Sequence, residues 1–566
     1  MSYCQEANIS DCEPMFNSKS LSFEVGDLED LDPNLSYLID EQYKVNFDTR
    51  YVIDGKRSLR IDGLKENLKT FATISLKIPF KVKKDAIIKV SVWAKTDSLR
   101  GENSGAILRL MGYNDTKGAN PSIFEFSETN LKGSEAWTLL SLTTSVKEDV
   151  NSIVVSTLMQ GKGSAWFDDL KLQINNEKIT DILFFEDAEV EEKTKKLVRA
   201  YVTPLDLQSL PKIGDFISNH HPNARIIGLG EATHGTKEIY QFKTEIIKAL
   251  IETHQVEKLA LEAYYANTEE LNNYINKGHG DLNTLISNLG FFLYRTKEFK
   301  DLIRWLKDYN NSTTSKISIT GVDSQPGGNS LKVLSEKLKN DTYSSKLLNQ
   351  LNSDTLKISQ KIAILDQLFT RTKEIKSDEL IITNARILKD SYYLSQFSGL
   401  KYSRVRDSLM AQNIEYLETN LAPEKKIIYW AHDLHIQKKE GWTGGYLNEK
   451  FGNNYMNLGF LLGSGTFTAV DKDSRKLDSD NKLSAIKCNS LEAIMHSYND
   501  STLLFKNKAA SNDLFLKNNF FSKYLEKRSI GALDGRDQFI ALGEDAGNIF
   551  DLLIYFKNST ATEILK

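Results

Sequence analysis

Two patterns of hydrophobic and polar residues divide the chain. Between about residues 20 and 175 the two kinds alternate over short runs, as in Phe71–Ile78 and Ala165–Leu172. Alternation with a period of two is typical of strands with one buried face. About eight such runs, separated by loops, predict an all-β, jelly-roll-like sandwich over residues 20–175. We expect residues 1–19 to form a flexible N-terminus.

The rest of the chain alternates strand-like and helix-like runs. Residues 176–203 are rich in charge and predict a linker helix, after which one domain spans residues 204–566. Short apolar runs followed by hydrophobic residues at steps of three and four are typical of an α/β domain with a parallel sheet. From about residue 330 to 420 helical patterns follow one another without a strand. We therefore expect a parallel-sheet α/β domain with a helical insertion.

Polar residues follow four of the strand-like runs, which end near residues 229, 261, 322 and 431. In a parallel sheet the carboxyl ends of the strands lie on one edge, where the active crevice opens. Side chains from distant segments should therefore converge there. They are Glu231, His234, Glu262, Asp323, His432 and His435.

Two cations lie on predicted helix faces. Lys243 lies beside the apolar stripe that contains Phe242 and Ile246, on a helix that Thr236 is expected to cap. A buried lysine needs an anionic partner, and the strand-end carboxylates are available. Arg406 lies on one face of a second predicted helix. The alternative, that both cations only extend their heads to the edge of the core, stays open.

Four blocks of the second domain resemble the erythromycin esterase family in their order and spacing. They are Gly230–Glu238, the Leu261–Glu262 strand end, Arg406–Asn413 and Ala431–His435, within about Pro204–Phe556. The resemblance implies a bacterial hydrolase that opens a carboxylic ester or lactone, of which macrolide lactones are the best-known case. It also implies active-site places for five residues, Glu231, His234, Glu262, His432 and His435.

Two positions differ from the family pattern. Lys243 stands where the family often has arginine, which keeps the charge but loses the planar fork that grips a carboxylate. Asp433 stands where the family often has asparagine, which adds negative charge between two histidines and makes a macrolide-type substrate less certain. In the first domain, Gly55–Ile61 and Ala165–Leu172 resemble galactose-binding-like sandwiches. Two interpretations of this domain stay open: it binds a glycan, or it is a rigid packing module.

Ester hydrolysis by activated water needs a base, a group that orients the base, and donors for the oxyanion. We expect His234 to be the base, because neutral imidazole titrates near working pH. Either Glu231 or Glu262 orients it, and His432 or His435, with Lys243 or Arg406, stabilises the oxyanion. The expected substrate-binding residues are Arg406, Asp323, Tyr264 and Glu238. Tyr264, Tyr265 and Trp442 flank the strand ends, where they line an apolar pocket or pack in the core.

Two other interpretations stay open. A divalent metal held by Glu231, His234, Glu262 and His432 would make the protein a metal-dependent hydrolase of another bond, although we expect no required cofactor. Alternatively, the crevice is inactive and the chain is a carbohydrate-binding envelope protein. A serine nucleophile is disfavoured because no Gly-x-Ser-x-Gly elbow occurs.

Composition narrows the partners. The chain has 72 basic and 76 acidic residues and a formal charge of −4, so neither nucleic acid nor an anionic membrane is expected as a partner. No apolar run is long enough to span a bilayer. No signal peptide is visible, which favours the cytoplasm by default and an extracytoplasmic address if the chain is a processed form. Cys4 and Cys12 are expected either to pair or to stay unpaired.

Overall fold

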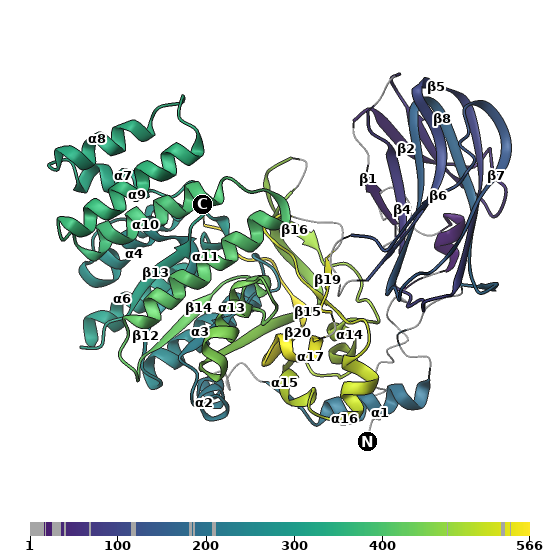
Figure 1. Cartoon of the computed structure of the whole chain (residues 1–566). Coiled ribbons are helices and arrows are strands. Elements are labelled where there is room, and N and C mark those ends of the chain that lie inside the picture. Colours follow the sequence, from purple (N-terminus) through teal and green to yellow (C-terminus); the bar gives the residue numbers. More distant parts are fainter. Residues whose placement is uncertain are drawn as a thin grey trace. The chain divides into compact units, whose positions relative to one another are not determined.

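A computed structural model describes residues 16, 18–24, 35–38, 41–66, 69–114, 120–179, 184, 187–205, 211–471, 474–533, 538–543 and 545–565. The chain divides into two compact units (Figure 1). One consists mainly of Ile9–Glu191, and the other consists mainly of Glu192–Ile486 and Ser490–Lys566.

The first unit is all-β, as predicted, and all its strand pairs are antiparallel. Its strands are β1 (Leu35–Leu38), β2 (Tyr43–Asp48), β3 (Ser58–Gly63), β4 (Ala72–Ile78), β5 (Ile87–Tyr113), β6 (Ile123–Phe126), β7 (Gly133–Ser145), β8 (Ser152–Ile174) and β9 (Glu177–Lys178). β8 lies between β4 and β3, and the long β5 pairs with β6, β7 and β8. The jelly-roll arrangement stays a prediction. A 3₁₀ turn, Ser18–Ser22, precedes the strands, while the other residues of the predicted flexible N-terminus lie outside the described part of the chain, apart from residue 16.

The linker helix is shorter than predicted. Asn175 and Asn176 both have positive φ, 51° and 71°, and turn the chain back so that β9 pairs with β8. Asparagine tolerates this left-handed conformation better than most residues, which makes it a common turn residue. The helix α1 therefore covers only Ala188–Arg199.

The second unit contains one mixed sheet in the order β10-β17-β20-β15-β11-β14-β12-β13. The six strands from β20 to β13 are parallel, as predicted, and β17 and β10 add an antiparallel edge. β16 pairs with β15 off this path, and β18 and β19 form a separate two-stranded sheet. The strands of the unit are β10 (Val202–Pro204), β11 (Ile226–Leu229), β12 (Val256–Tyr264), β13 (Ser318–Asp323), β14 (Lys426–Trp430), β15 (Tyr455–Val470), β16 (Leu477–Lys482), β17 (Thr502–Phe505), β18 (Glu526–Arg528), β19 (Phe539–Ala541) and β20 (Leu552–Ser559).

Helices of this unit pack around the sheet (Figure 1). Those outside the insertion are α2 (Pro211–His220), α3 (Lys237–Thr253), α4 (Tyr265–Lys277), α5 (Leu282–Ser287), α6 (Lys297–Ser312), α12 (Asp433–Ile436), α13 (Thr443–Phe451), α14 (Leu491–His496), α15 (Asn507–Ala510), α16 (Leu514–Leu516) and α17 (Ala546–Ile549). Short 3₁₀ turns cover Phe292–Tyr294 and Gly452–Asn454, and a π-helical turn covers Lys517–Phe521.

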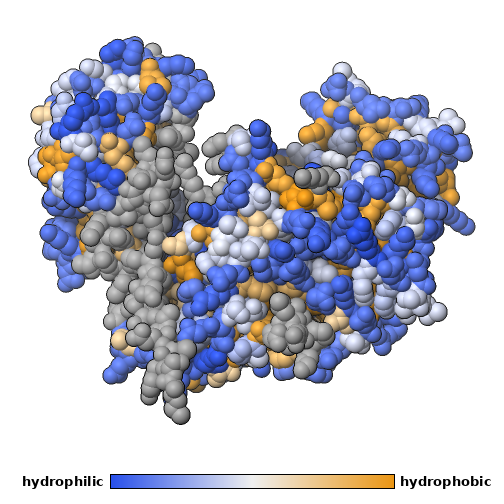
Figure 2. All heavy atoms as spheres, turned by 180° about the vertical axis from the view of Figure 1, so that it is seen from behind, coloured by the Kyte–Doolittle hydropathy of each residue, from blue (hydrophilic) through white to orange (hydrophobic). Residues whose placement is uncertain are grey.

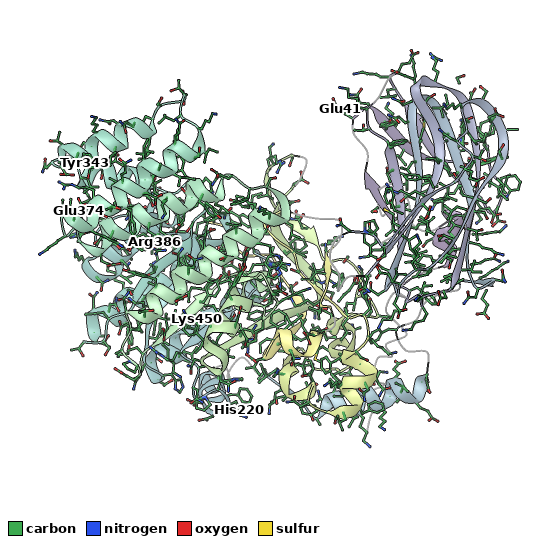
Figure 3. All side chains as sticks on the ribbon, in the orientation of Figure 1. Glu41, His220, Tyr343, Glu374, Arg386 and Lys450 are labelled. Carbon is green, nitrogen blue, oxygen red and sulfur yellow. The ribbon has the colours of Figure 1, made fainter. Side chains whose placement is uncertain are left out.

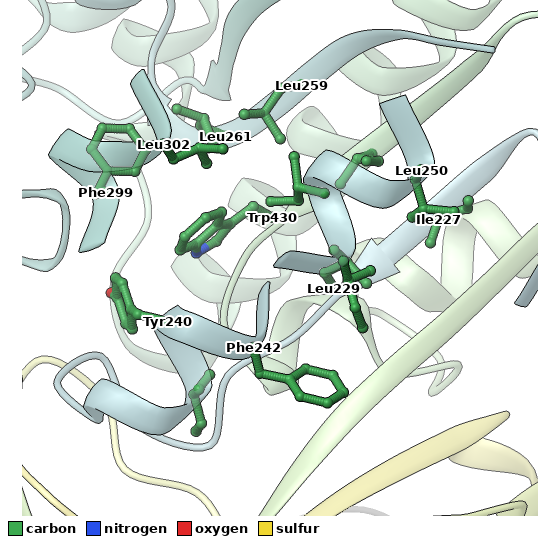
Figure 4. Packing of buried hydrophobic residues seen from close by; sticks show 14 of the residues in the cluster. Ile227, Leu229, Tyr240, Phe242, Leu250, Leu259, Leu261, Phe299, Leu302 and Trp430 are labelled. Atoms are coloured by element: carbon green, nitrogen blue, oxygen red, sulfur yellow. The ribbon is translucent and has the colours of Figure 1, made fainter. Parts of the chain in front are cut away.

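The core of the second unit surrounds Trp430, at the end of β14. Its ring packs edge-on against Tyr240 and Phe299, with centroids 5.3 and 5.8 Å away (Figure 4). Phe242 and Ile246 of α3 are fully buried, so the predicted stripe is confirmed. The predicted side-chain cap is wrong, because the Thr236 hydroxyl bonds to that of Thr233 instead.

The helical insertion is confirmed. Between β13 and β14 the chain forms α7 (Ser330–Lys337), α8 (Thr342–Leu351), α9 (Ile358–Glu374), α10 (Glu379–Leu394) and α11 (Gly399–Thr419). Tyr343, Glu374 and Arg386, labelled in Figure 3, belong to this layer.

Side chains from neighbouring helices form hydrogen bonds with backbone groups of the edge strand β13. Asn272 of α4 bonds both the N–H and the C=O of Ile319, at 2.7 and 2.6 Å. Thr268 accepts from the Gly321 N–H, and Asn413 of α11 donates to the Val322 carbonyl at 2.7 Å. α4 and the insertion thus satisfy groups that an exposed edge strand would leave open.

The face shown in Figure 2 is mostly hydrophilic, with small scattered hydrophobic patches. None of the helices in the described part of the chain combines the length and the apolar character needed to cross a membrane. Cys488 is bound in a disulfide, while Cys4 and Cys12 lie outside the described residues.

Candidate active site

The predicted convergence at the strand ends occurs. β11, β14, β12 and β13 are neighbours in the sheet. Glu231 and His234 follow β11, Glu262 lies within the end of β12, Asp323 ends β13, and His432 follows β14. These side chains are almost completely buried, with exposed fractions between 0 and 7%. The parallel arrangement therefore places residues from four segments at one edge.

His234 and Glu231 form a dyad. Nδ1 of His234 lies 2.6 Å from Oε1 of Glu231, so this nitrogen donates to the carboxylate. No described residue hydrogen-bonds to that Nε2. The His234 ring lies 4.9 Å from the His432 ring and 6.5 Å from that of Phe292, measured between centroids. The dyad thus leaves one ring nitrogen without a hydrogen-bond partner among the described residues.

The second oxygen of Glu231 is held by two donors. Nζ of Lys243 and Nε1 of Trp430 each donate to Oε2 at 2.9 Å. Lys243 also lies 4.0 Å from the centre of the Trp430 ring, a cation–π contact. Lys243 is fully buried, so the interpretation that it extends to the edge of the core is wrong.

Charge in this group is compensated. Burial alone would raise the pKa of Glu231, but Lys243 and His234 lower it to about 2. Burial lowers the pKa of Lys243 to about 8, although Glu231 opposes this change. At neutral pH the carboxylate and the ammonium are therefore both charged, and Glu231 is fixed as an acceptor for His234.

A second cluster is centred on Arg406 of α11. Its guanidinium donates to Asp323 at 2.7 Å and to Oε1 of Glu262 at 2.6 Å. Burial disfavours the charge, but Asp323 and Glu262 raise the pKa of Arg406 well above its usual value. Arg406 is thus a paired cation in the site, which agrees with the predicted convergence.

His435 belongs to this cluster. Its Nδ1 lies 2.9 Å from Asp407, and its Nε2 lies 3.2 Å from Glu262 and 3.1 Å from a nitrogen of Arg406. Burial lowers the pKa of His435, but Asp407 and Glu262 outweigh it and raise the value to about 10. Burial likewise opposes ionisation of Glu262, whose pKa His435 and Arg406 nevertheless hold well below the usual range. His435 is therefore an imidazolium at neutral pH.

His432 has both ring nitrogens engaged. It caps α12: Nδ1 accepts from the Leu434 N–H at 3.2 Å, while Nε2 donates to the Ile530 carbonyl at 3.0 Å. Burial is the main cause that lowers the pKa of His432 to about 3, and the neighbouring charge of His435 adds to it. His432 is therefore a neutral ring without a free nitrogen, and its backbone N–H holds Oε2 of Glu262 at 3.0 Å.

Asp433 does not add free negative charge between the histidines, contrary to expectation. It is 1% exposed, and its Oδ2 pairs with Nζ of Lys527 at 2.6 Å. Its other oxygen lies where a Cβ on Gly230 would stand, 1.9 Å away, so only glycine fits at position 230. Lys527 on β18 precedes Ile530, whose carbonyl binds His432.

Trp430, Asp407, Lys527 and Ile530 were missed in the sequence. Asp407 follows Arg406 directly in a block already noted, and Trp430 precedes His432 by two residues, so both had a local signal. Lys527 and Ile530 had none, because they reach the site only through tertiary packing.

Two of the predicted substrate-binding residues lie outside these clusters. Tyr264 is partly exposed and bonds the Pro326 carbonyl at 3.2 Å. Glu238 is bound to the backbone and hydroxyl of Thr560, at 2.8 and 2.7 Å, and is not part of either cluster.

The predicted metal ligands do not form a recognisable metal site. Among the described residues, no group of three or more His, Cys, Asp or Glu side chains is arranged to hold a metal ion. Each oxygen of Glu231 and Glu262 already accepts from a protein donor.

Known proteins resemble the second unit. The Erythromycin esterase family profile matches residues 251–559. A putative hydrolase of Bacillus subtilis, YbfO, is 23% identical over 333 residues, which cover 49% of this chain and 74% of that protein. Erythromycin esterase type II of Escherichia coli is 26% identical over 302 residues, 44% of this chain and 71% of that protein.

Solved structures share the fold. A Bacillus cereus protein superposes with a TM-score of 0.58 at 21% identity, covering 66% of this chain and 99% of that one. A mutant of the erythromycin esterase EreC in its open conformation gives a TM-score of 0.50 at 16% identity, covering 64% and 99%. Since the family profile matches more than half of its length, this chain belongs to the erythromycin esterase family.

Proposed function

We propose that the protein hydrolyses a carboxylic ester or lactone by water that His234 activates. The observation that carries this proposal is the His234–Glu231 dyad, in which Nδ1 is held at 2.6 Å and Nε2 has no hydrogen-bond partner among the described residues. An imidazole oriented by a carboxylate is a suitable general base near neutral pH. Family membership supports hydrolysis in general.

In the proposed reaction, Nε2 of His234 removes a proton from water while the water oxygen attacks the carbonyl carbon. The C=O electrons move to the oxygen to give a tetrahedral oxyanion. When the oxyanion collapses, the C–O bond to the leaving alcohol breaks, and His234 returns its proton to that alcohol. Glu231 stabilises the transient imidazolium, and Lys243 with Trp430 keeps Glu231 in position.

The oxyanion needs positive donors whose side chains are not fully buried. Lys243 is fully buried against Glu231. Both ring nitrogens of His432 already form hydrogen bonds, one to the Ile530 carbonyl and one to the Leu434 N–H. The side chains of Arg406 and His435 are 14% and 10% exposed and charged. We therefore propose that Arg406 and His435 stabilise the oxyanion, while Glu262 and Asp323 hold the guanidinium of Arg406 in place.

The test is a substrate screen with matched variants. The wild type, His234→Ala and His220→Ala are assayed against p-nitrophenyl esters, simple lactones and macrolides. His220 lies at the end of α2, away from the strand ends (Figure 3), and is the control. We expect the His220 variant to keep its activity and the His234 variant to lose about 10²–10⁴-fold. Near-normal turnover by folded His234→Ala would disprove the proposal.

Metal dependence is tested in the same assay. We expect activity to survive dialysis against a chelator, because the carboxylate oxygens are occupied by protein donors. Loss of activity that zinc or manganese restores, together with bound metal in the purified protein, would favour the metal-dependent alternative instead.

A further inference from the structure

A cavity of 250 Å³ lies between the end of β12, the loop after β13 and the insertion helices α7 and α10. It has no part in the chemistry proposed above. Its volume is below the roughly 300–1,000 Å³ of sites that enclose drug-sized ligands, so it fits a single ring rather than a macrocycle.

The wall of the cavity is uncharged and combines polar groups with a larger apolar surface. None of the described residues that line it is acidic or basic. Tyrosine and serine hydroxyls and the amide of Gln325 supply the polar groups, while Leu331, Ile387 and Leu388 supply apolar surface. Such a wall suits a ligand with hydroxyls and apolar C–H faces. It disfavours a carboxylate or a phosphate, because a buried charge without a partner is costly.

One cavity residue also contacts the charged cluster around Arg406. The side-chain amide of Gln325 donates to Asp323 at 2.6 Å, and Asp323 is the partner of Arg406. The other end of that amide accepts from the Tyr402 hydroxyl at 3.3 Å. A ligand in the cavity therefore touches a residue that contacts the active site directly.

Aromatic packing makes a second connection. Phe292 packs edge-on against the His234 ring, and its neighbour Phe291 packs on Tyr264, with centroids 4.8 Å apart. Tyr264 forms a wall of the cavity. Gln325 and this series of aromatic rings therefore connect the cavity, through one or two intervening residues, to both parts of the candidate site.

The cavity is shaped by close backbone approach and keeps an open hydroxyl. Gly327 has φ of +117°, and a Cβ there would lie 3.0 Å from the Tyr264 hydroxyl oxygen. The hydroxyl of Tyr392, on the α10 side, bonds to no described residue. Tyrosine offers an apolar ring face and a polar tip together, a combination that suits sugar-like rings.

We propose that this cavity is a substrate subsite for one uncharged, hydroxyl-bearing ring of hexose size, attached to the ester that is cleaved. This inference rests on the proposed hydrolysis and adds the substrate class to it: a neutral sugar or cyclitol ester.

Ser395→Trp tests the subsite. Ser395 is an exposed lining residue at the end of α10, and a tryptophan there fills the mouth of the cavity. Gln396→Trp is the matched control, because Gln396 is an exposed neighbour that is not part of the lining. Both variants are assayed with p-nitrophenyl acetate and with a mono-acetylated methyl glucoside.

We expect Ser395→Trp to raise KM for the sugar ester at least about tenfold and to leave the small aryl ester unchanged. Gln396→Trp should change neither. Equal effects of Ser395→Trp on both esters, or no effect on the sugar ester, would overturn the proposal.

Direct binding separates this inference from the hydrolytic one. His234→Ala protein is titrated by calorimetry with phenyl glucoside and with phenyl glucuronide, which has the same ring and a carboxylate. We expect at least about tenfold preference for the glucoside, lost in His234→Ala with Ser395→Trp. Glucoside binding without any esterase activity would support the subsite and sink the hydrolytic proposal. Esterase activity without a preference for the glucoside would do the reverse.

Discussion

His234 and His435 lie on the same edge of one sheet, yet their partners differ in number and charge. His234 has one carboxylate on Nδ1, and its Nε2 has no hydrogen-bond partner in the part of the chain that the structure describes. His435 contacts Asp407 on one nitrogen and Glu262 and Arg406 on the other, and its raised pKa keeps it charged. Two identical side chains thus suit different tasks, proton transfer for His234 and fixed positive charge for His435. His432 differs from both, because it is neutral and fully hydrogen-bonded.

The largest expected effect is on turnover, when His234 is replaced. His234→Gln removes the base while keeping a polar group of similar size. We expect kcat to fall about 10²–10⁴-fold, and the urea midpoint to stay close to that of the wild type. A variant that unfolds at much lower urea concentration would mean that His234 is mainly structural.

Disturbing the charged histidine, His435, should mainly reduce the stability of the protein. Asp407→Ala leaves the buried His435 imidazolium without its main partner, and we expect the free energy of unfolding to fall by about 3–5 kcal/mol. Urea titration measures it. Asp366→Ala is the control, since its carboxylate is 57% exposed beside Lys389 and should cost less than about 1 kcal/mol. Equal losses in the two variants would contradict the difference in burial.

Arg406→Lys sharpens the role of the guanidinium. Lysine keeps the charge but cannot bind Asp323 and Glu262 in a fork. Loss of one charge-assisted hydrogen bond predicts a fall in kcat/KM of about ten- to a hundredfold. An unchanged kcat/KM would show that charge alone suffices, as a point cation would provide.

The smallest effect concerns pH. Lys243, with its pKa lowered to about 8, is an ammonium below that pH and holds Glu231 as the acceptor of His234. We expect kcat/KM to decline as pH rises above about 8, and Lys243→Arg to move this alkaline limb upward by at least about one unit. pH–rate profiles of both proteins measure it.

The alkaline decline should not reflect unfolding through Lys243. Because its folded-state pKa lies below the unfolded-state value, the unfolded chain binds more protons between pH 8 and about 10.4, and this group favours the folded state increasingly as pH rises through that window. An alkaline limb at the same pH in Lys243→Arg would exclude Lys243 as its source.

The sequence predicted the positions of this site better than its roles. Site residues that follow apolar strands can be recognised in the sequence, because the carboxyl ends of parallel strands lie at one edge of the sheet. That logic located Glu231, Glu262, Asp323 and His234. It could not tell which nitrogens are open, since the partners of His432 include a carbonyl at Ile530, 98 residues further along the chain.

Asp433 is a second residue whose partner could not be predicted from the sequence. In the sequence, Asp433 stands between two histidines and suggests a negative cleft. In the folded chain it is buried on Lys527, which no local pattern connects to it. Alternation and helical spacing report which face is buried, but only tertiary contacts report what a buried charge meets.

The hydrogen-bonded edge of β13 connects the position of Arg406 to the tendency of the chain to associate. Asn413, which covers the Val322 carbonyl, lies two turns along α11 from Arg406. Removing α11 to reshape the site would therefore also expose part of β13, and an exposed edge strand can pair with another molecule. Engineered versions of this enzyme class that lose α11 should form intermolecular sheets before their substrate range can be measured.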